Sequence, residues 1–355
     1  MSKILVTGAA GFIGSQFLEI LLRDRPDTQI VVLDKLTYAG HEKTLAHAVV
    51  SSGLEASRAA ARYEFIRGDI CDRKLLRSLF EKHRFSQVVN FAAESHVDRS
   101  IESAAEFIET NILGVFSLLD ASLRHFESLE GSSREAFRFL QVSTDEVFGQ
   151  LGDEGAFTEE TPYAPSSPYS ASKASGDHLA RAWHHTYKLP VIVTNCSNNY
   201  GPRQYPEKLI PHMIACALSE KPLPVYGNGK NVRDWIHVAD HARGVLLALE
   251  KGRVGESYCF GGRSERRNIG VVEAICDELQ KIRPRKAGSY RDLITFVEDR
   301  KGHDWRYAID DSKSEKELGF KREFSSFEDG LRATIRWYLE NGTWVKTVTE
   351  KAGEA

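Results

Sequence analysis

The sequence predicts an α/β fold, in which a doubly wound parallel sheet is followed by a smaller C-terminal α/β domain. Short runs rich in β-branched residues alternate with longer amphipathic stretches, which is the order of a parallel sheet with crossover helices. A glycine-rich turn lies between the first of these strands and the first helix. The chain of 355 residues also exceeds one average domain, which leaves room for a second unit.

Six segments have the residue pattern of buried strands, and helical patterns lie between them. The predicted strands are Ile4–Thr7, Ile30–Leu33, Tyr63–Arg67, Gln87–Phe91, Arg138–Val142 and Val191–Asn195. The predicted helices are Phe12–Arg23, Lys74–His83, Ala104–Leu123 and Tyr169–Tyr187. The Ser/Ala-rich segment 50–61 is predicted to be a helix or a surface excursion. Six strands suffice for a complete doubly wound sheet.

After Tyr200 the pattern of strands and helices loosens, which indicates where a second domain begins. Gly201-Pro202 is followed by the segment 221–229, which holds two prolines and two glycines. We predict a first domain of residues 1–200 plus about 235–258, and a second domain of about 201–234 and 259–345. Residues 346–355 are predicted to be a frayed tail.

Composition excludes several classes of protein. The formal net charge of −3 lacks the basic excess typical of nucleic-acid binding. No apolar run is long enough to span a bilayer, and the N-terminus enters a strand pattern without a signal peptide. The five cysteines lie far apart with no C-x-x-C pair, which favours a reducing cytoplasm over a disulfide framework or a zinc site. His237 and His241 are four residues apart but have no third ligand, so no metal site is predicted.

The glycine-rich turn predicts a dinucleotide site. It reads Thr7-Gly8-Ala9-Ala10-Gly11-Phe12-Ile13-Gly14, with the spacing G-x-x-G-x-x-G instead of G-x-G-x-x-G. Between a strand and a helix, such glycines let backbone N–H groups approach a pyrophosphate at the helix N-terminus. The first domain is therefore predicted to be a Rossmann-type dinucleotide-binding domain.

Asp34 ends the second predicted strand, twenty residues after Gly14. A carboxylate there can accept hydrogen bonds from the adenosine ribose and would repel a 2′-phosphate, which favours NAD over NADP. Lys35 weakens this inference slightly, because its charge could attract a phosphate. Asp69 closes the third strand, where it could bind the adenine amino group or only stabilise a turn.

Tyr169 and Lys173 are one turn apart on a predicted helix, so the phenol and the ammonium group lie on the same face. The nearby cation, helped by the positive charge of a bound nicotinamide, favours the phenolate and can move the pKa of the tyrosine from about 10 toward the working pH. Tyr169 can then act as a general base toward an alcohol. Together with the glycine-rich turn, this pair resembles the short-chain dehydrogenase/reductase superfamily.

Thr144, Asp145 and Glu146 follow the predicted strand Arg138–Val142 and lie at the carboxyl end of the sheet, where ligands bind. The Thr144 hydroxyl can hydrogen-bond a sugar hydroxyl that is being oxidised. The two carboxylates offer an acid and a base for proton transfers that plain dehydrogenation does not need. Taken alone, the segment is also compatible with a solvated acidic loop.

With Tyr169 and Lys173, the segment Thr144-Asp145-Glu146 resembles the dTDP-glucose 4,6-dehydratase family, and the resemblance extends over nearly the whole chain. Further matching segments are Asp34–Gly40, Phe91–Ser100, Cys196–Gln204, Pro206–Pro211 and Arg233–Trp235. The match departs at Phe148, where a tyrosine is usual, at Lys301, where a proline is common, and at Cys259-Phe260. These departures leave every catalytic group in place and affect only the shape of the pocket.

The resemblance implies a lyase that converts dTDP-glucose to its 4-keto-6-deoxy derivative, as in dTDP-rhamnose synthesis. Tyr169 removes the C4 hydroxyl proton while hydride passes to bound NAD. The ketone acidifies the C5 hydrogen, so Glu146 abstracts it while protonated Asp145 delivers a proton to the C6 hydroxyl and water leaves. The hydride then returns to C6, so NAD is regenerated at each turnover.

The resemblance also assigns binding residues and an assembly. With the glycines of the turn, the NAD contacts are Gly8, Gly11, Phe12, Ile13, Gly14, Asp34, Lys35, Thr37, Asp69, Ile70, Ala92, Ala93, Ser95, Thr110, Tyr169, Lys173 and Asn199. The nucleotide-sugar contacts are Ser95, Thr144, Asn198, Glu207, Lys208, Leu209, Pro224, Tyr226, Arg233, Asn268 and the stretch from Asp299 to His303. Arg233 and Lys208 suit a diphosphate, since a guanidinium can bind two oxygens at once. A homodimer is expected, with the apolar faces of Ala104–Leu123 and Tyr169–Tyr187 forming a four-helix interface.

Three alternatives share this fold. A nucleotide-sugar 4-epimerase needs Thr144, Tyr169 and Lys173 but no acid and base for elimination. A UDP-glucuronate decarboxylase or GDP-mannose dehydratase often carries the glutamate but typically lacks the aspartate, so Asp145 discriminates against both. A non-catalytic NAD-binding module would be indicated by the loss of a catalytic group, and all of these groups are present. The residues leave open whether thymidine or uridine is the preferred nucleoside.

Overall fold

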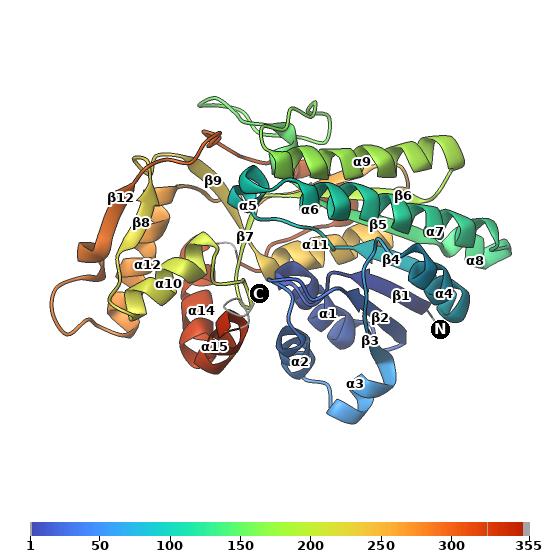
Figure 1. The fold of residues 1–355 in the computed structure, drawn as a ribbon, viewed down its shortest axis with the longest axis horizontal. Coiled ribbons are helices and arrows are strands. Elements are labelled where there is room, and N and C mark those ends of the chain that lie inside the picture. The colour runs from blue at the N-terminus through green and yellow to red at the C-terminus, as the bar shows by residue number, and fades with distance from the viewer. Residues whose placement is uncertain (1, 325, 351–355) are drawn as a thin grey trace.

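Seven parallel strands form the central sheet of the protein (Figure 1). The computed structural model describes residues 2–324 and 326–350. The strands run in the order β10-β6-β5-β4-β1-β2-β3 and are β1 (Ser2–Thr7), β2 (Thr28–Asp34), β3 (Tyr63–Arg67), β4 (Gln87–Asn90), β5 (Arg138–Thr144), β6 (Val191–Cys196) and β10 (Ser257–Phe260). The predicted α/β doubly wound parallel sheet is thus confirmed.

The seventh strand, β10, is absent from the sequence-based prediction. It spans only Ser257–Phe260 and contains no β-branched residue, so its pattern is too short to indicate a strand. It pairs in parallel with β6 at the edge of the sheet, and Tyr258 and Phe260 are fully buried. Pairing and burial in the folded protein therefore create this strand.

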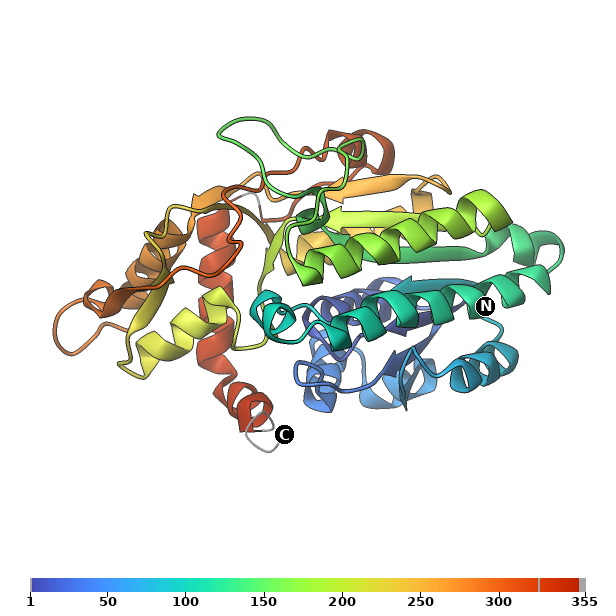
Figure 2. The same ribbon diagram turned by 45° about the horizontal axis from the view of Figure 1, so that its top comes forward.

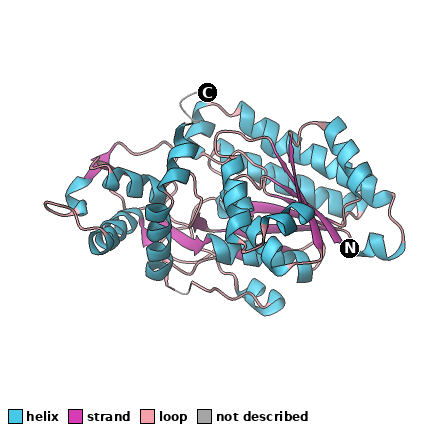
Figure 3. Cartoon of the chain, turned by 90° about the horizontal axis from the view of Figure 1, so that it is seen from below, coloured by secondary structure: helices cyan, strands magenta, loops and turns pink. Residues whose placement is uncertain are grey.

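Helices cover both faces of the sheet, because side chains alternate along each strand (Figures 1 and 3). On β1, Ile4 and Val6 face the helices α1 (Phe12–Asp24), α2 (Glu42–Ser51) and α11 (Val238–Lys251). Leu5 faces α4 (Arg73–His83), α7 (Val115–Glu127) and α9 (Pro168–Tyr187) on the other side. The sheet is thus buried on both sides, as expected for parallel strands.

The predicted helix Ala104–Leu123 is divided into three parts. These are α6 (Ala105–Ile108), a π-helical segment η1 (Glu109–Gly114) and α7. The Asn111 side chain, inside η1, accepts a hydrogen bond from the Glu94 amide at 3.0 Å and donates to the Glu94 carbonyl at 2.9 Å. These bonds tie the distorted turn to the loop after β4. Such π-helical turns are frequent at functional sites.

A second lobe follows the sixth strand (Figure 2). Its strands are β7 (Asn198–Tyr200), β8 (Leu223–Tyr226), β9 (Val232–His237), β11 (Glu265–Arg267) and β12 (Ile294–Val297). Its helices are α10 (Leu209–Leu218), α12 (Asn268–Ile282), α14 (Phe327–Glu340), α15 (Gly342–Glu350) and the short 3-10 turn η3 (Tyr290–Leu293). They enclose a separate apolar core that includes Tyr200, Met213 and Val271. The exact division into two domains stays a prediction, because α13 (Ser312–Leu318) returns to pack on α11 and β10.

The C-terminal segment differs from the predicted frayed tail. Residues 346–350 complete α15, in which Trp344 and Val348 are buried. The Trp344 ring lies 5.1 Å from that of Trp337, edge to face. This burial explains why the helix continues, while residues 351–355 lie outside the described part of the chain.

The remaining short elements lie at the rims of the sheet. They are α3 (Ala56–Arg62), α5 (Val97–Glu102), α8 (Gly131–Ala136) and the 3-10 turn η2 (Asp145–Phe148). The segment 50–61 therefore holds the end of α2, a turn and most of α3, in agreement with a partly helical excursion. None of the helices in the described residues is long and apolar enough to cross a membrane.

Candidate active site

A cavity of about 310 Å³ lies at the carboxyl ends of the central strands. Every residue predicted to contact NAD lines it: Gly8, Gly11, Phe12, Ile13, Gly14, Asp34, Lys35, Thr37, Asp69, Ile70, Ala92, Ala93, Ser95, Thr110, Tyr169, Lys173 and Asn199. These residues come from seven segments of the chain, which lie side by side only in the folded protein. Their binding roles stay predictions.

The glycine-rich turn has the close packing that a pyrophosphate site requires. Gly8 has a φ of +71°, and a Cβ there would lie 2.5 Å from the Ala92 amide nitrogen. A Cβ on Gly14 would lie 2.5 Å from the Gly8 carbonyl oxygen. Gly11 precedes α1 without a side chain that caps it, so the first N–H groups of the helix are directed at the cavity. The turn therefore fits a dinucleotide.

The carboxylates at the ends of β2 and β3 have different partners. Asp34 accepts hydrogen bonds from the amides of Ala10 and Leu36, each at 2.8 Å. Asp69 accepts one from the Cys71 amide at 2.9 Å and pairs with the Lys35 ammonium at 2.7 Å. The pKa of Asp69 is lowered, because the Cys71 amide and Lys35 favour the charged form more than burial disfavours it. Lys35 is thus neutralised by Asp69, which removes its expected attraction for a phosphate.

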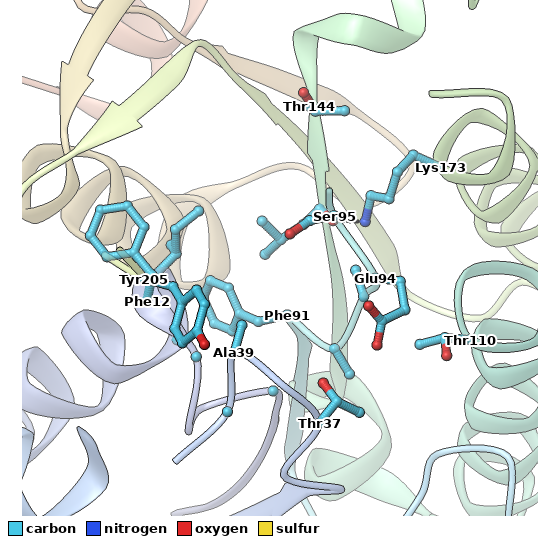
Figure 4. A pocket seen from close by; sticks show the side chains of 18 of the residues that line it. Phe12, Thr37, Ala39, Phe91, Glu94, Ser95, Thr110, Thr144, Lys173 and Tyr205 are labelled. Atoms are coloured by element: carbon cyan, nitrogen blue, oxygen red, sulfur yellow. Dashed lines mark hydrogen bonds between the residues drawn. The ribbon is translucent and has the colours of Figure 1, made fainter. Parts of the chain in front are cut away.

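Figure 4 shows the interior of this cavity. Thr144 lies at the end of β5, and the Lys173 side chain points inward from α9. The Glu94 side chain lies between Thr37 and Thr110. Burial raises the pKa of the Glu94 carboxyl. Glu94 is therefore a polar cavity residue that the sequence-based assignment does not include.

Tyr169 and Thr144 both line the cavity, and the Thr144 hydroxyl favours the ionised form of the Tyr169 phenol. Tyr169 is buried, and burial raises its pKa well above the usual value, with Glu146 adding to the effect and Thr144 opposing it. The Lys173 ammonium donates to the Val142 carbonyl at 2.8 Å. The predicted lowering of the Tyr169 pKa by Lys173 is thus not produced by the chain alone, because desolvation outweighs the nearby cation.

Asp145 and Glu146 differ in their surroundings although they are adjacent. Asp145 is buried, and burial together with Glu146 raises its pKa well above the usual value. Its Oδ1 accepts from the Thr144 hydroxyl at 3.2 Å, whereas its Oδ2 has no hydrogen-bond partner. Glu146 is partly exposed; burial raises its pKa, but Arg233 and Lys208 oppose this shift. Asp145 therefore favours the protonated acid, and Glu146 is the better base.

A second cavity of about 460 Å³ adjoins the first one on the side of the second lobe. It is lined by most of the predicted substrate residues: Ser95, Asn198, Glu207, Lys208, Leu209, Pro224, Tyr226, Arg233, Asn268 and His303. Thr144 lines the first cavity, and Glu146 lines both. Asp299 lines neither; its carboxylate contacts the His303 imidazole at 2.6 Å, so it orients this histidine.

Three basic side chains surround the second cavity. Arg233 is buried, donates to the carbonyls of Val232 and Asp304, and lies 4.1 Å from the centre of the Tyr307 ring. Lys208 donates to the Ser95 carbonyl at 3.0 Å, and burial lowers its pKa. The third cation belongs to Arg300. Three cationic side chains therefore line one cavity, together with the carboxylates of Glu146, Glu207 and Asp304.

Sequence reasoning missed several side chains that shape the two cavities. They include Glu94, Gln204, Tyr205, Asp304 and Tyr307. Tyr307 donates to the Asp304 carboxylate and supports Arg233 from below the guanidinium plane. The sequence offers one signal for the contact between Tyr307 and Arg233: Tyr307 follows the predicted substrate stretch Asp299–His303 by four residues.

The two candidate metal-binding histidines have other contacts. His237 and His241 are buried, and the Nδ1 atom of His241 lies 2.9 Å from the Asn199 Oδ1. Burial lowers the pKa of both imidazoles to about 3. Across residues 2–324 and 326–350, no three His, Cys, Asp or Glu side chains gather in a metal-binding cluster.

Comparison with known proteins agrees with this geometry. Residues 5–334 match the family model described as GDP-mannose 4,6 dehydratase. The dTDP-glucose 4,6-dehydratase of Xanthomonas campestris pv. campestris (strain B100) is 54% identical, and the match covers 99% of this chain and 97% of that one. That of Neisseria meningitidis serogroup B is 53% identical, with 98% and 96% covered. The chain belongs to the dTDP-glucose 4,6-dehydratase family.

Solved structures place the chain in the same family. The dTDP-glucose 4,6-dehydratase of Streptomyces venezuelae, crystallised with NAD and TYD bound, has a TM-score of 0.85 and 44% identity, covering 98% of this chain and 99% of that one. The Bacillus anthracis enzyme, in complex with NAD, has a TM-score of 0.83 and 42% identity, with 98% and 100% covered. A UDP-glucuronic acid 4-epimerase from Bacillus cereus is more distant at 29% identity and a TM-score of 0.80. The resemblance inferred from the sequence is therefore confirmed.

Proposed function

We propose that this protein dehydrates dTDP-glucose to dTDP-4-dehydro-6-deoxy-glucose with NAD as a cofactor that is regenerated in each cycle. The observation that carries the proposal is the cluster of Thr144, Asp145, Glu146 and Tyr169 at one place in the cavity. Thr144 and Tyr169 are sufficient for oxidation of a hydroxyl. The adjacent acid and base are needed only when water is eliminated.

In the oxidation step, Tyr169 accepts the C4 hydroxyl proton, and Thr144 orients this hydroxyl. NAD, when bound, supplies the hydride acceptor at C4 and later the hydride donor at C6. Lys173 lies one turn after Tyr169 on the same face of α9. Its positive charge favours the phenolate form of Tyr169. Because its pKa is raised, Tyr169 is neutral when no ligand is bound. The positive charge of bound NAD would then favour loss of the phenol proton.

In the elimination step, Glu146 takes the C5 proton, whose acidity is raised by the C4 ketone. The electron pair of the C5–H bond forms the C5–C6 double bond as the C6–O bond breaks. Asp145 gives its proton to the departing oxygen, which leaves as water. Its burial and raised pKa keep that proton in place beforehand, and its unpaired Oδ2 is a suitable donor position. The Glu146 carboxyl exchanges its proton with solvent and then protonates C5 as the hydride returns to C6.

The nucleotide diphosphate binds in the cavity of the second lobe, beside Lys208, Arg233 and Arg300. Their positive charges offset the two charges of a nucleoside diphosphate sugar. Because Glu146 lines both cavities, the sugar must extend from this site toward Tyr169. This arrangement brings C4, C5 and C6 to the catalytic groups.

Mass spectrometry of dTDP-glucose tests this function. The purified protein is incubated with the sugar nucleotide in heavy water and without added NAD. We expect loss of one water and incorporation of deuterium at C5, which together require oxidation, elimination and internal hydride return. Formation of the galactose isomer with unchanged mass would identify an epimerase instead. No change with NAD and other nucleotide sugars present would overturn the catalytic assignment.

A homodimer is the assembly that the exposed apolar side chains support. Ile101, Ile108 and Leu113 are 42%, 49% and 53% exposed near the start of α7, and Tyr187 ends α9 at 49%. The helices α7 and α9 pack side by side on one face of the molecule (Figure 2). Two such pairs can form a four-helix interface. Light scattering should give twice the chain mass, and Leu113→Glu should give the monomer.

A cytoplasmic location fits the five cysteines, all of which are free thiols. The product would then serve deoxysugar synthesis, such as that of dTDP-rhamnose. Fractionation of the source cells is the direct measurement of the location.

A further inference from the structure

Three ionisable side chains follow one another on the buried face of α9. Tyr169, Lys173 and Asp177 are spaced four residues apart, so the phenol, the ammonium and the carboxylate lie on the same side of the helix. All three are buried, and Asp177 is fully inaccessible. The reaction described above uses the first two groups and gives no role to Asp177.

Asp177 accepts two hydrogen bonds on one oxygen. The Ser143 hydroxyl donates to its Oδ2 at 2.6 Å, and the Tyr163 hydroxyl donates to the same atom at 3.0 Å. Its Oδ1 is buried without a hydrogen-bond partner. Burial raises the pKa of the Asp177 carboxyl, whereas Lys173 and the two hydroxyl donors favour its ionised form. Since Ser143 immediately precedes Thr144, the carboxylate also holds the end of β5.

Lys173 needs a countercharge at this depth. Its ammonium donates to the Val142 carbonyl, which is neutral, and a buried unpaired charge is costly. Asp177 is the carboxylate that favours the charged form of Lys173. The Cys196 thiol is also near, but burial raises its pKa, so it stays neutral.

The other neighbours of the pair are polar and few. The titratable and charged groups around it are Tyr169 and Arg181 on α9, Cys196 on β6 and Tyr163 in the loop before α9. Arg181 donates to the Tyr163 hydroxyl at 2.8 Å and to the Ser257 hydroxyl at 3.1 Å. The hydrogen-bonded chain thus connects Asp177 with the rim of the sheet.

We propose that Asp177 is a positioning residue, which keeps Lys173 in its charged form beside Tyr169 and, through Ser143, holds Thr144 in place. This role rests on the proposed function, because it acts through Tyr169, Lys173 and Thr144. It predicts that the charge of Asp177 matters more than its hydrogen bonds.

The substitution Asp177→Asn tests the charge while keeping the shape of the side chain. With the negative charge gone, Lys173 loses its proton at lower pH. The basic limb of the profile of kcat/KM against pH should therefore move to lower pH, and kcat/KM at neutral pH should fall by about tenfold or more. Tyr163→Phe removes one hydrogen-bond donor to Asp177 but leaves the Asp177 charge. The limbs of its pH profile should therefore stay at their wild-type positions. Asp120→Asn, which breaks an exposed ion pair on α7, is the matched control.

Thermal unfolding gives a second measurement that requires no turnover. Asp177→Asn and Lys173→Met should each lower Tm, since each leaves the other charge buried and unpaired. The double variant should recover part of this loss. Additive losses, together with pH limbs at their wild-type positions, would overturn the proposal. Because this cycle is independent of activity, it separates a failure of the pairing from a failure of the proposed function.

Discussion

The two cavities of this protein are built in opposite ways. In the cavity at the ends of the parallel strands, the glycine-rich turn brings backbone atoms to the surface, because Gly8 and Gly14 allow contacts that a Cβ would prevent. The nucleotide-sugar cavity is formed by side chains from the second lobe, among them Lys208, Arg233 and Arg300. We therefore expect the first cavity to recognise a ligand by close approach to the backbone, and the second to recognise one by charge.

This difference separates steric from electrostatic control of binding. At the first site, a side chain in place of Gly8 or Gly14 would require the backbone to move. At the second, the exchange of an arginine for a lysine keeps the charge and the backbone but loses the planar guanidinium. Glu146 lies where the two cavities meet, so it alone among the proposed proton donors and acceptors faces both ligands. Variants in the first cavity should thus change the affinity for NAD, and variants in the second should change KM for dTDP-glucose.

The largest effect is expected where the cavities meet. Glu146→Gln removes the proposed base and should slow water loss by about 10²–10⁴-fold, the range typical of general base catalysis. Oxidation at C4 should persist, because Tyr169 and Thr144 remain. Rapid-quench mass spectrometry of the sugar nucleotide measures both steps. Glu135→Gln on the exposed helix α8 serves as the control. A wild-type rate of water loss in Glu146→Gln would contradict the assignment.

A steric change should disable only the cofactor cavity. In Gly14→Ala, the new Cβ would lie 2.5 Å from the Gly8 carbonyl oxygen, so the turn must shift. We expect NAD affinity to fall by more than about tenfold, or about 1.4 kcal/mol. The NAD content of the purified protein and its titration with NAD measure this loss. Gly270→Ala, which meets open space, is the matched control. Weakened dTDP binding by the same amount would show that the cavities are not separable in this way.

A charge-conserving change should weaken only the nucleotide cavity. Arg233→Lys keeps the positive charge but loses the planar fork and its packing on Tyr307. KM for dTDP-glucose should rise by about tenfold, or about 1.4 kcal/mol, with NAD content unchanged. Steady-state kinetics at saturating and limiting substrate distinguish KM from kcat. The exposed Arg336→Lys provides a comparison, and equal kinetics for both variants would exclude this role of Arg233.

The smallest expected effect is a change in stability with pH. The pKa of Asp145 is raised above its ordinary value of 3.8, so stability is fully present below that pH and is lost as pH rises through the raised pKa. Asp145→Asn should not lose stability in this way, because an asparagine side chain does not ionise. Its Tm should exceed that of the wild type at neutral pH by about 2 °C, and the difference should vanish near the ordinary pKa of an aspartate. Calorimetry of both proteins with equal NAD content is the measurement, and a constant difference would contradict it.

Sequence reasoning predicted the cofactor cavity better than the nucleotide cavity for a physical reason. The glycine-rich turn and the pair Tyr169 and Lys173 are local patterns, in which spacing alone implies geometry. Lys208 and Arg233 come from separate segments, and only the resemblance to a family pointed to them. Tyr307 was missed because its contact with Arg233 is visible only in three dimensions.

The same limit applies to the fold and to electrostatics. The six predicted strands are present, whereas β10 depends on its pairing with β6. The spacing of Tyr169 and Lys173 predicted their common helix face, but not the desolvation that raises the tyrosine pKa. Burial results from the whole fold, so a short motif cannot report it.

The return of the chain to the sheet at β10 has a consequence for how the protein can be shortened. The second lobe begins after β6, yet β10 covers the outer edge of that strand. A fragment that ends before Ser257 would keep the glycine-rich turn but leave the backbone of β6 unpaired along this edge. Such an edge invites association with other chains. Only the part of the second lobe between β6 and β10 is inserted in this way, and the rest of the lobe follows β10. A stable fragment that contains the first cavity alone therefore requires β10 to be joined back to the sheet.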